Sequence, residues 1–178
     1  MQQNEFSVRR IVTGVDDDGK SIIAEDGPSP HVTYISENGE FALVDLWRTS
    51  AAPSQARAVD KVTRPAVLSP DPGGSVVRVL RMPPFADMEA NSPGDGFDPS
   101  AKSAFENQDK SIHPGMHKTN SVDYAIILSG EVWAILERGE TRMCAGDVLI
   151  QRATSHAWEN RSDQSCVIAF VLVDAEDR

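Results

Sequence analysis

The sequence predicts an all-β protein, an antiparallel barrel or sandwich, and three features of its C-terminal part lead to this prediction. From Gly115 onward, short apolar runs recur at near-regular spacing, tight turns separate them, and almost no segment shows a helical pattern. Short strands and turns in this order are typical of β-sandwiches and barrels. The predicted strands of this part are Tyr124–Leu128, Val132–Glu137, Val148–Gln151, His156–Asn160 and Cys166–Val173.

The N-terminal part adds strands of the same kind. A hairpin is predicted over Ser7–Gly27, because an Asp-Asp-Asp-Gly turn separates two strand-like runs. Ala51–Pro70 is predicted to be a long loop, and Ser103–Asp109 a single helical turn. The predicted strands of this part are Val8–Thr13, Ser21–Glu25, Phe41–Arg48 and Ser75–Met82.

The length of the chain, 178 residues, fits one domain with an extension better than two domains. We expect residues 1–74 to form an N-terminal extension, with the hairpin and a strand packing on a barrel. Residues 75–178 are then expected to form the barrel itself.

Composition limits the classes of partner. The formal net charge is −10, and an acidic surface repels both phosphate backbones and anionic membranes. We therefore expect neither nucleic acid nor membrane as a partner. The apolar run Val167–Val173 is too short to span a bilayer, and the first ten residues lack the apolar stretch of a signal peptide. These features predict a cytoplasmic protein.

Cysteine usage also excludes some chemistry. The two cysteines, Cys144 and Cys166, form no C-x-x-C pair, which excludes a zinc ribbon or a thioredoxin motif. Buried thiols are expected for both, and a disulfide between them stays open as an alternative. No Gly-rich phosphate loop or G-x-S-x-G elbow is present to support a nucleotide-dependent enzyme or a serine hydrolase.

Two histidines and a carboxylate are candidates for a metal site. His117 and Asp123 would lie about 20 Å apart on one straight strand, because each residue rises about 3.3 Å. A corner at Thr119-Asn120-Ser121 would instead fold the chain back and place Asp123 beside His117. With His156 from a later strand, the three side chains would form a facial triad suited to Fe, Mn, Zn or Ni. The same three residues are the candidate catalytic groups.

His113 leaves two interpretations open. On a straight strand it would lie about 13 Å from His117, too far to share an ion. A kink at Pro114-Gly115 would bring it closer, as a fourth candidate metal ligand. Otherwise it is a pocket residue that orients the substrate or donates a proton.

Two stretches of the chain resemble the two motifs of the cupin superfamily, small single-domain cupins in particular. Ser111–Gly130 is similar to the first motif, G-x5-H-x-H-x3-E-x6-G, and Gly146–Asn160 is similar to the second, G-x5-P-x-G-x2-H-x3-N. The first motif departs at Ser111, Thr119 and Asp123, which replace a glycine, the second histidine and the glutamate. In the second motif, Arg152 and Thr154 replace the proline and the glycine, with one residue fewer before His156.

The resemblance implies a double-stranded β-helix, or jelly-roll barrel, with the N-terminal hairpin as an extension. It also implies a divalent transition metal at the barrel mouth, held by His117, Asp123 and His156, and a homodimer. The residues predicted to line the substrate pocket are His113, Thr119, Trp158, Gln151 and Tyr124.

Three functions are compatible with such a barrel. The first is an enzyme, a metal-dependent oxidoreductase or lyase, that acts on a small oxygenated organic substrate by dioxygenase, decarboxylase or isomerase chemistry. The second is a non-catalytic module that binds a small molecule, which the reduced ligand set favours. The third is a metal-free cupin in which a His/Asp pair performs acid–base chemistry, as sugar epimerases of this fold do.

Overall fold

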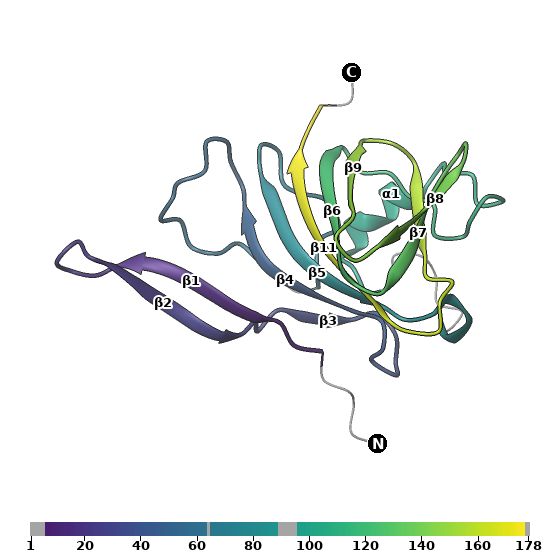
Figure 1. Ribbon diagram of the computed structural model, residues 1–178. Helices are drawn as coiled ribbons and strands as arrows, with labels where there is room; N and C mark the ends of the chain where they lie inside the picture. Colours follow the sequence, from purple (N-terminus) through teal and green to yellow (C-terminus); the bar gives the residue numbers. More distant parts are fainter. Residues whose placement is uncertain (1–5, 64, 89–95, 177–178) are drawn as a thin grey trace.

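The computed structural model describes residues 6–63, 65–88 and 96–176, and it consists mainly of antiparallel strands (Figure 1). Three short helical segments accompany the strands: the 3-10 helices Phe85–Asp87 and Pro99–Ala101, and helix α1, Lys102–Phe105. The strands are β1 Arg9–Val15, β2 Ser21–Pro28, β3 Val32–Tyr34, β4 Ala42–Thr49, β5 Ser75–Met82, β6 Ser121–Ser129, β7 Glu131–Leu136, β8 Glu140–Cys144, β9 Val148–Arg152, β10 His156–Glu159 and β11 Cys166–Asp174.

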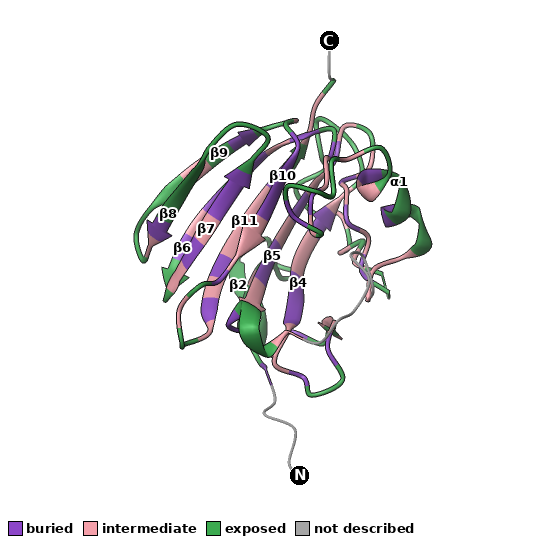
Figure 2. Cartoon of the chain, turned by 90° about the vertical axis from the view of Figure 1, so that its right-hand side faces the viewer, coloured by how far each residue is buried: buried purple, intermediate pink, exposed green. Residues whose placement is uncertain are grey.

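Two sheets form the barrel. The larger sheet has six strands in the order β3-β4-β5-β11-β6-β9, and the smaller has three in the order β10-β7-β8. Along β6, buried and more exposed side chains alternate, because successive residues of a strand point to opposite faces. Figure 2 shows this alternation along the barrel strands. The inward residues of both sheets meet in one core cluster: Met82, Ala125, Ile127, Val132, Ala134, Met143, Cys166 and Ile168.

The all-β jelly-roll prediction is confirmed, together with its N-terminal hairpin. Each predicted strand corresponds to an observed one, and Ser75–Met82 has the predicted bounds. Two strands were not predicted from the sequence: β3, which has three residues, and β8, in which Met143 is the one buried side chain. A strand with so little buried surface has no alternating apolar pattern to reveal it.

The predicted division at residues 74 and 75 separates two strands that pair directly. β4 pairs with β5 from Ala42 opposite Arg81 to Thr49 opposite Ser75. The strand of the N-terminal part therefore lies within the six-stranded sheet, and the division into extension and barrel stays a prediction. Both cysteines are free thiols; Cys166 is buried, as expected, and Cys144 is half-buried. No helix among the described residues is long and apolar enough to cross a membrane.

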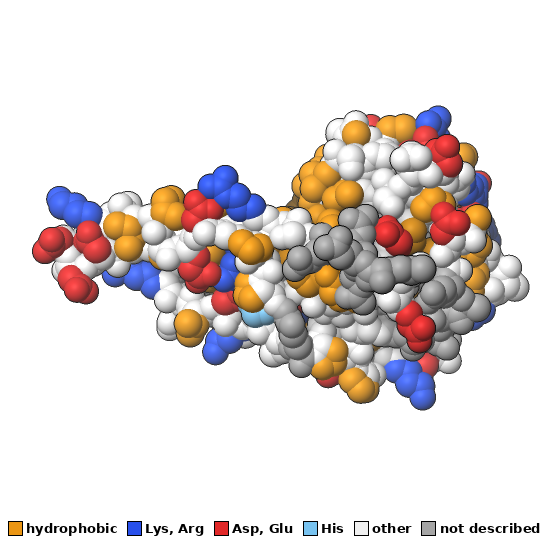
Figure 3. Space-filling view, turned by 90° about the horizontal axis from the view of Figure 1, so that it is seen from below, with side chains coloured by type: hydrophobic (Ala, Val, Ile, Leu, Met, Phe, Trp, Pro, Cys, Tyr) orange, Lys and Arg blue, Asp and Glu red, His pale blue; other side chains and the backbone are white. Residues whose placement is uncertain are grey.

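The β1–β2 hairpin projects from the barrel (Figures 1 and 3). It carries exposed apolar side chains, including Ile11 at 51% and Ile23 at 59% of their full exposure. A two-stranded hairpin is marginally stable in water by itself. The hairpin is therefore the surface through which we expect the predicted homodimer to form.

We expect the protein to have the solution mass of two chains in light scattering, and an Ile11→Asp/Ile23→Asp variant to have the mass of one chain. A Lys20→Ser variant, in the turn of the same hairpin, is expected to remain a dimer. A single-chain mass for the unaltered protein would contradict the prediction.

Candidate functional site

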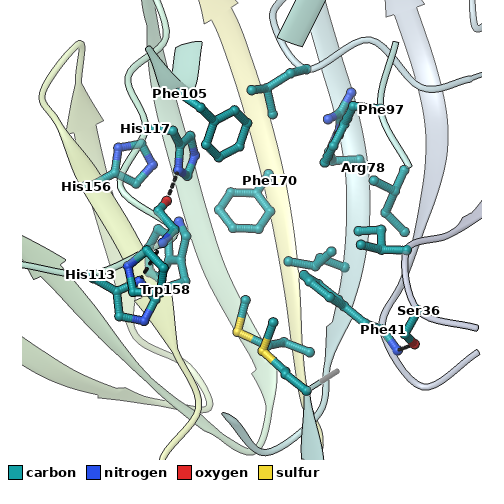
Figure 4. Close-up of a pocket in the computed structure, with 18 of the residues that line it drawn as sticks. Ser36, Phe41, Arg78, Phe97, Phe105, His113, His117, His156, Trp158 and Phe170 are labelled. Carbon is teal, nitrogen blue, oxygen red and sulfur yellow. Dashed lines mark hydrogen bonds between the residues drawn. The ribbon is translucent and has the colours of Figure 1, made fainter. Parts of the chain in front are cut away.

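A cavity of about 580 Å³ lies between the six-stranded sheet and β10, and apolar side chains make up most of its wall (Figure 4). Aromatic rings are prominent in that wall: Phe41, Phe85, Phe97, Phe105, Trp158 and Phe170. The polar or titratable side chains are fewer: Ser36, Arg78, Asp87, His113, His117, Thr119, Asp123 and His156. A mainly apolar cavity with a few converging polar groups is the usual form of a small-molecule site.

His117 and His156 lie side by side in the cavity wall. The backbones of the two residues form an antiparallel bridge, with N–H to O distances of 2.8 and 2.9 Å. This bridge brings the centroids of the imidazole rings to 4.2 Å from each other. The sequence-based placement of these two histidines at one site agrees with this geometry.

Backbone carbonyls determine the proton position on both rings. Nδ1 of His117 lies 2.9 Å from the carbonyl oxygen of Gly115, and Nδ1 of His156 lies 2.9 Å from that of Thr154. A carbonyl oxygen can only accept a hydrogen bond, so each Nδ1 carries the proton and donates it. In the neutral rings, Nε2 of each histidine is then a bare acceptor.

Burial keeps both rings neutral. The pKa of His117 is lowered from 6.5 to about 3, first by burial and second by the neighbouring His156. Burial also lowers the pKa of His156, while its hydrogen bond to Thr154 acts in the opposite direction. At neutral pH the pair therefore presents two uncharged nitrogen acceptors.

Asp123 lines the same cavity from β6. Its side chain is buried, and its Oδ1 atom has no hydrogen-bond partner among the described residues. Burial raises the pKa of this carboxyl group, and hydrogen bonds from Ser121 and Thr119 and the charge of Arg78 reduce that effect. A raised pKa widens the pH range over which Asp123 is protonated and can donate a hydrogen bond.

The predicted three-ligand metal centre is only partly assembled. In the described part of the chain, no three side chains of the His, Cys, Asp and Glu types come together as a group that could hold a metal ion. The two bare Nε2 atoms are suitable donors, and a carbonyl bound to each Nδ1 is the usual support of a metal-binding histidine. A facial triad requires a third ligand, which Asp123 does not supply in this geometry, so the residues do not fit the expected metal.

His113 lies in the cavity wall, with its nitrogens engaged differently. Its Nδ1 accepts a hydrogen bond of 3.0 Å from the backbone N–H of Gly115, which leaves the proton on Nε2. That Nε2 lies 3.4 Å from a carboxylate oxygen of Glu159. The backbone N–H and carbonyl of Gly115 therefore connect His113 to His117. The role of His113 in orienting the substrate or donating a proton stays a prediction.

The other predicted pocket residues divide into two groups. Thr119 and Trp158 line the cavity, and the Trp158 ring meets the His156 ring edge-on at 5.9 Å. The prediction for Tyr124 was wrong: its side chain is 41% exposed, on the opposite face of β6 from Asp123. Gln151 is buried but is absent from the cavity wall, because its amide donates to the carbonyl of Thr154.

Arg78 is a polar residue of the cavity wall that the sequence did not predict. It lies on β5 with its guanidinium in the cavity wall, 2.9 Å from a carboxylate oxygen of Asp45. Both side chains are almost fully buried. The sequence did contain a sign of its position, because Arg78 is a charged residue in the middle of the apolar strand Ser75–Met82. It lies two residues after the buried Val76 and therefore on the same face of the strand.

Comparisons with known proteins identify relatives for part or most of the chain. No protein-family model matches. A stretch of 71 residues is 46% identical to Phomopsin biosynthesis cluster protein C' of Diaporthe leptostromiformis, and covers 36% of this chain and 38% of that protein. The cupin-domain-containing oxidoreductase fogC of Aspergillus ruber is 24% identical over 179 residues, which cover 96% of this chain and 74% of fogC.

A solved structure with a similar chain course is the Cnp3 cupin domain of Schizosaccharomyces pombe. It has a TM-score of 0.47 and 9% sequence identity, and the alignment covers 95% of this chain and 89% of that domain.

Proposed function

The chain is a member of the cupin superfamily, and on this basis we propose that it is an enzyme acting on a small oxygenated organic molecule inside the barrel. The observation that supports this proposal best is the pair of neutral imidazoles, His117 and His156, each with a bare Nε2 at the wall of an apolar cavity. The cupin-domain relatives whose names describe them as oxidoreductases support an enzymatic role in general terms.

The chemistry that these residues can perform without a further group is proton transfer on carbon. Nε2 of one imidazole takes a proton from a carbon next to a carbonyl group: the C–H bond breaks, an N–H bond forms, and the substrate becomes an enolate. Asp123, whose burial favours the protonated form, donates a hydrogen bond to the enolate oxygen. Return of the proton to another position completes an isomerisation.

Burial makes this transfer depend on the substrate. An imidazolium alone in an apolar cavity is unfavourable, as the low pKa of His117 indicates. Beside an enolate, the same cation has an opposite charge within a medium of low dielectric constant, where the attraction is strong. The cavity therefore favours protonation of the histidine only when the substrate anion forms next to it.

Exchange of carbon-bound hydrogen tests the proposal. The protein is expected to accelerate the loss of the C2 protons of 1-tetralone in D2O, measured by proton NMR. At least one of the variants His117→Phe and His156→Phe is expected to lower this rate by about 10²-fold or more, the usual contribution of a general base. His31→Gln is the matched control, because His31 lies outside the cavity wall. No acceleration by the unaltered protein, or an unchanged rate in both variants, would contradict the proposal.

Metal-dependent oxidation is a second candidate function, favoured by the names of the relatives. Because the described residues supply two ligands where a triad needs three, no step is assigned to a metal. Metal analysis of the protein purified without added metal tests this candidate. A stoichiometric transition metal, Fe, Mn, Zn or Ni, that is lost in His117→Ala would support it. Absence of metal under every loading condition would exclude it.

A further inference from the structure

We infer that the ligand of this cavity is an uncharged aromatic or conjugated molecule whose hydroxyl group, a phenol or an enol, donates a hydrogen bond to the histidine pair. This inference rests on the proposed site and names its substrate class. Three properties of the cavity support it: the hydrogen-bonding character of the histidines, the shape of the wall, and the balance of charge.

The histidine pair selects a hydrogen-bond donor. Nδ1 of each ring already donates to a backbone carbonyl, so only the Nε2 acceptors of His117 and His156 remain for a ligand. A ketone, ether or carboxylate oxygen would face these nitrogens lone pair to lone pair. A hydroxyl group satisfies an acceptor, and an enol hydroxyl is also the group that proton transfer from carbon to oxygen creates.

The wall of the cavity favours a ligand that is flat and apolar. Around the histidine pair, the ring of Phe105 lies 5.1 Å from that of His117, and the rings of Trp158 and Phe170 lie 5.5 Å apart. Figure 4 shows the histidines and Arg78 on opposite sides of the cavity, with Phe170 between them. Aromatic walls at such distances favour offset or edge contacts with another ring. A cavity of about 580 Å³ accommodates a molecule of two fused rings.

The charges disfavour an anion. Among the described residues of the wall, Arg78 is the one Lys or Arg side chain, and Asp45 lies 2.9 Å from its guanidinium. Its Nη2 atom also donates to the carbonyl of Val67 at 2.6 Å. The carboxyl groups of the wall belong to Asp87 and Asp123. A carboxylate ligand would therefore lose its hydration without gaining a free cation.

Equilibrium binding of three matched probes tests the inference. The probes are 1-naphthol, 1-methoxynaphthalene and 1-naphthoate, and calorimetry on the full chain at pH 7 gives their affinities. We expect 1-naphthol to bind about tenfold more tightly than 1-methoxynaphthalene, because one net hydrogen bond contributes about this factor. We expect 1-naphthoate to bind most weakly. Equal affinities, or tightest binding of 1-naphthoate, would overturn the inference.

Variants locate the hydroxyl contact. His117→Phe/His156→Phe is expected to remove the preference for 1-naphthol over 1-methoxynaphthalene, and His31→Gln is expected to retain it. If the double variant does not fold, the affinities of the unaltered protein for the three probes still test the inference. If the folded double variant still prefers 1-naphthol, the inference is overturned. It is also overturned if EDTA treatment of the unaltered protein removes the preference, because the hydroxyl group would then bind a metal.

The binding and exchange experiments can fail independently. Proton exchange on 1-tetralone without the 1-naphthol preference would overturn the assigned substrate class and leave the enzymatic proposal standing. The preference without exchange would leave the ligand class standing and contradict the proposed reaction.

Discussion

Replacement of Arg78 by leucine is expected to lower the free energy of unfolding by about 3–5 kcal/mol, the usual effect of removing one partner of a buried ion pair. Nε of Arg78 lies 2.9 Å from Oδ1 of Asp45, and the two side chains are 5% and 6% exposed. Without Arg78, the Asp45 carboxylate would remain in the interior with its nearest counter-charge lost. Burial already raises the pKa of Asp45, and the charge of Arg78 is the largest opposing influence.

Urea unfolding measures the loss of stability in Arg78→Leu and in a matched variant of an exposed ion pair. The comparison separates the effect of burial from that of losing an ion pair. The Arg142–Glu131 pair lies at the surface, with side chains 54% and 26% exposed, so Arg142→Leu is expected to change stability by less than about 1 kcal/mol. The double variant Arg78→Leu/Asp45→Leu is expected to recover much of the loss, because it removes the uncompensated charge. Similar losses in Arg78→Leu and Arg142→Leu would contradict this account.

Acidification from pH 7 to pH 4 is expected to destabilise the protein through His117. Its pKa is about 3 in the folded protein, against 6.5 for an ordinary histidine, so the unfolded chain binds more protons between these values. Stability therefore falls as the pH falls through this window. The side chain of His117 is half-buried and keeps some solvent contact. With that discount we expect a loss of about 2–3 kcal/mol from His117. Asp123, with its raised pKa, acts in the opposite direction.

Thermal unfolding between pH 7 and pH 4 measures this effect. A folded His117→Phe variant is expected to lose less stability on acidification than the unaltered protein. An equally steep fall in His117→Phe would show that His117 does not cause the acid sensitivity.

The wrong assignment of Tyr124 to the pocket could have been avoided from the sequence. Asp123 and Tyr124 are neighbours on one strand, and neighbours on a strand point to opposite faces. Alternation alone therefore shows that Asp123 and Tyr124 cannot both line the same pocket. Gln151 differs, because it stands opposite Asp123 in the sheet, and the engagement of its amide with Thr154 depends on the turn that follows.

The sequence by itself determined the all-β class and the N-terminal hairpin, and it placed His117 and His156 at one site. These depend on local periodicity, turn residues and motif spacing, which neighbouring residues express directly. Only the tertiary structure decided the proton positions on the two histidines, the missing third ligand and the buried Arg78–Asp45 pair. The proton positions depend on how the folded backbone places the carbonyls of Gly115 and Thr154 against the two rings. The missing ligand and the buried ion pair depend on distances between side chains far apart in the sequence, which packing sets and local sequence does not encode.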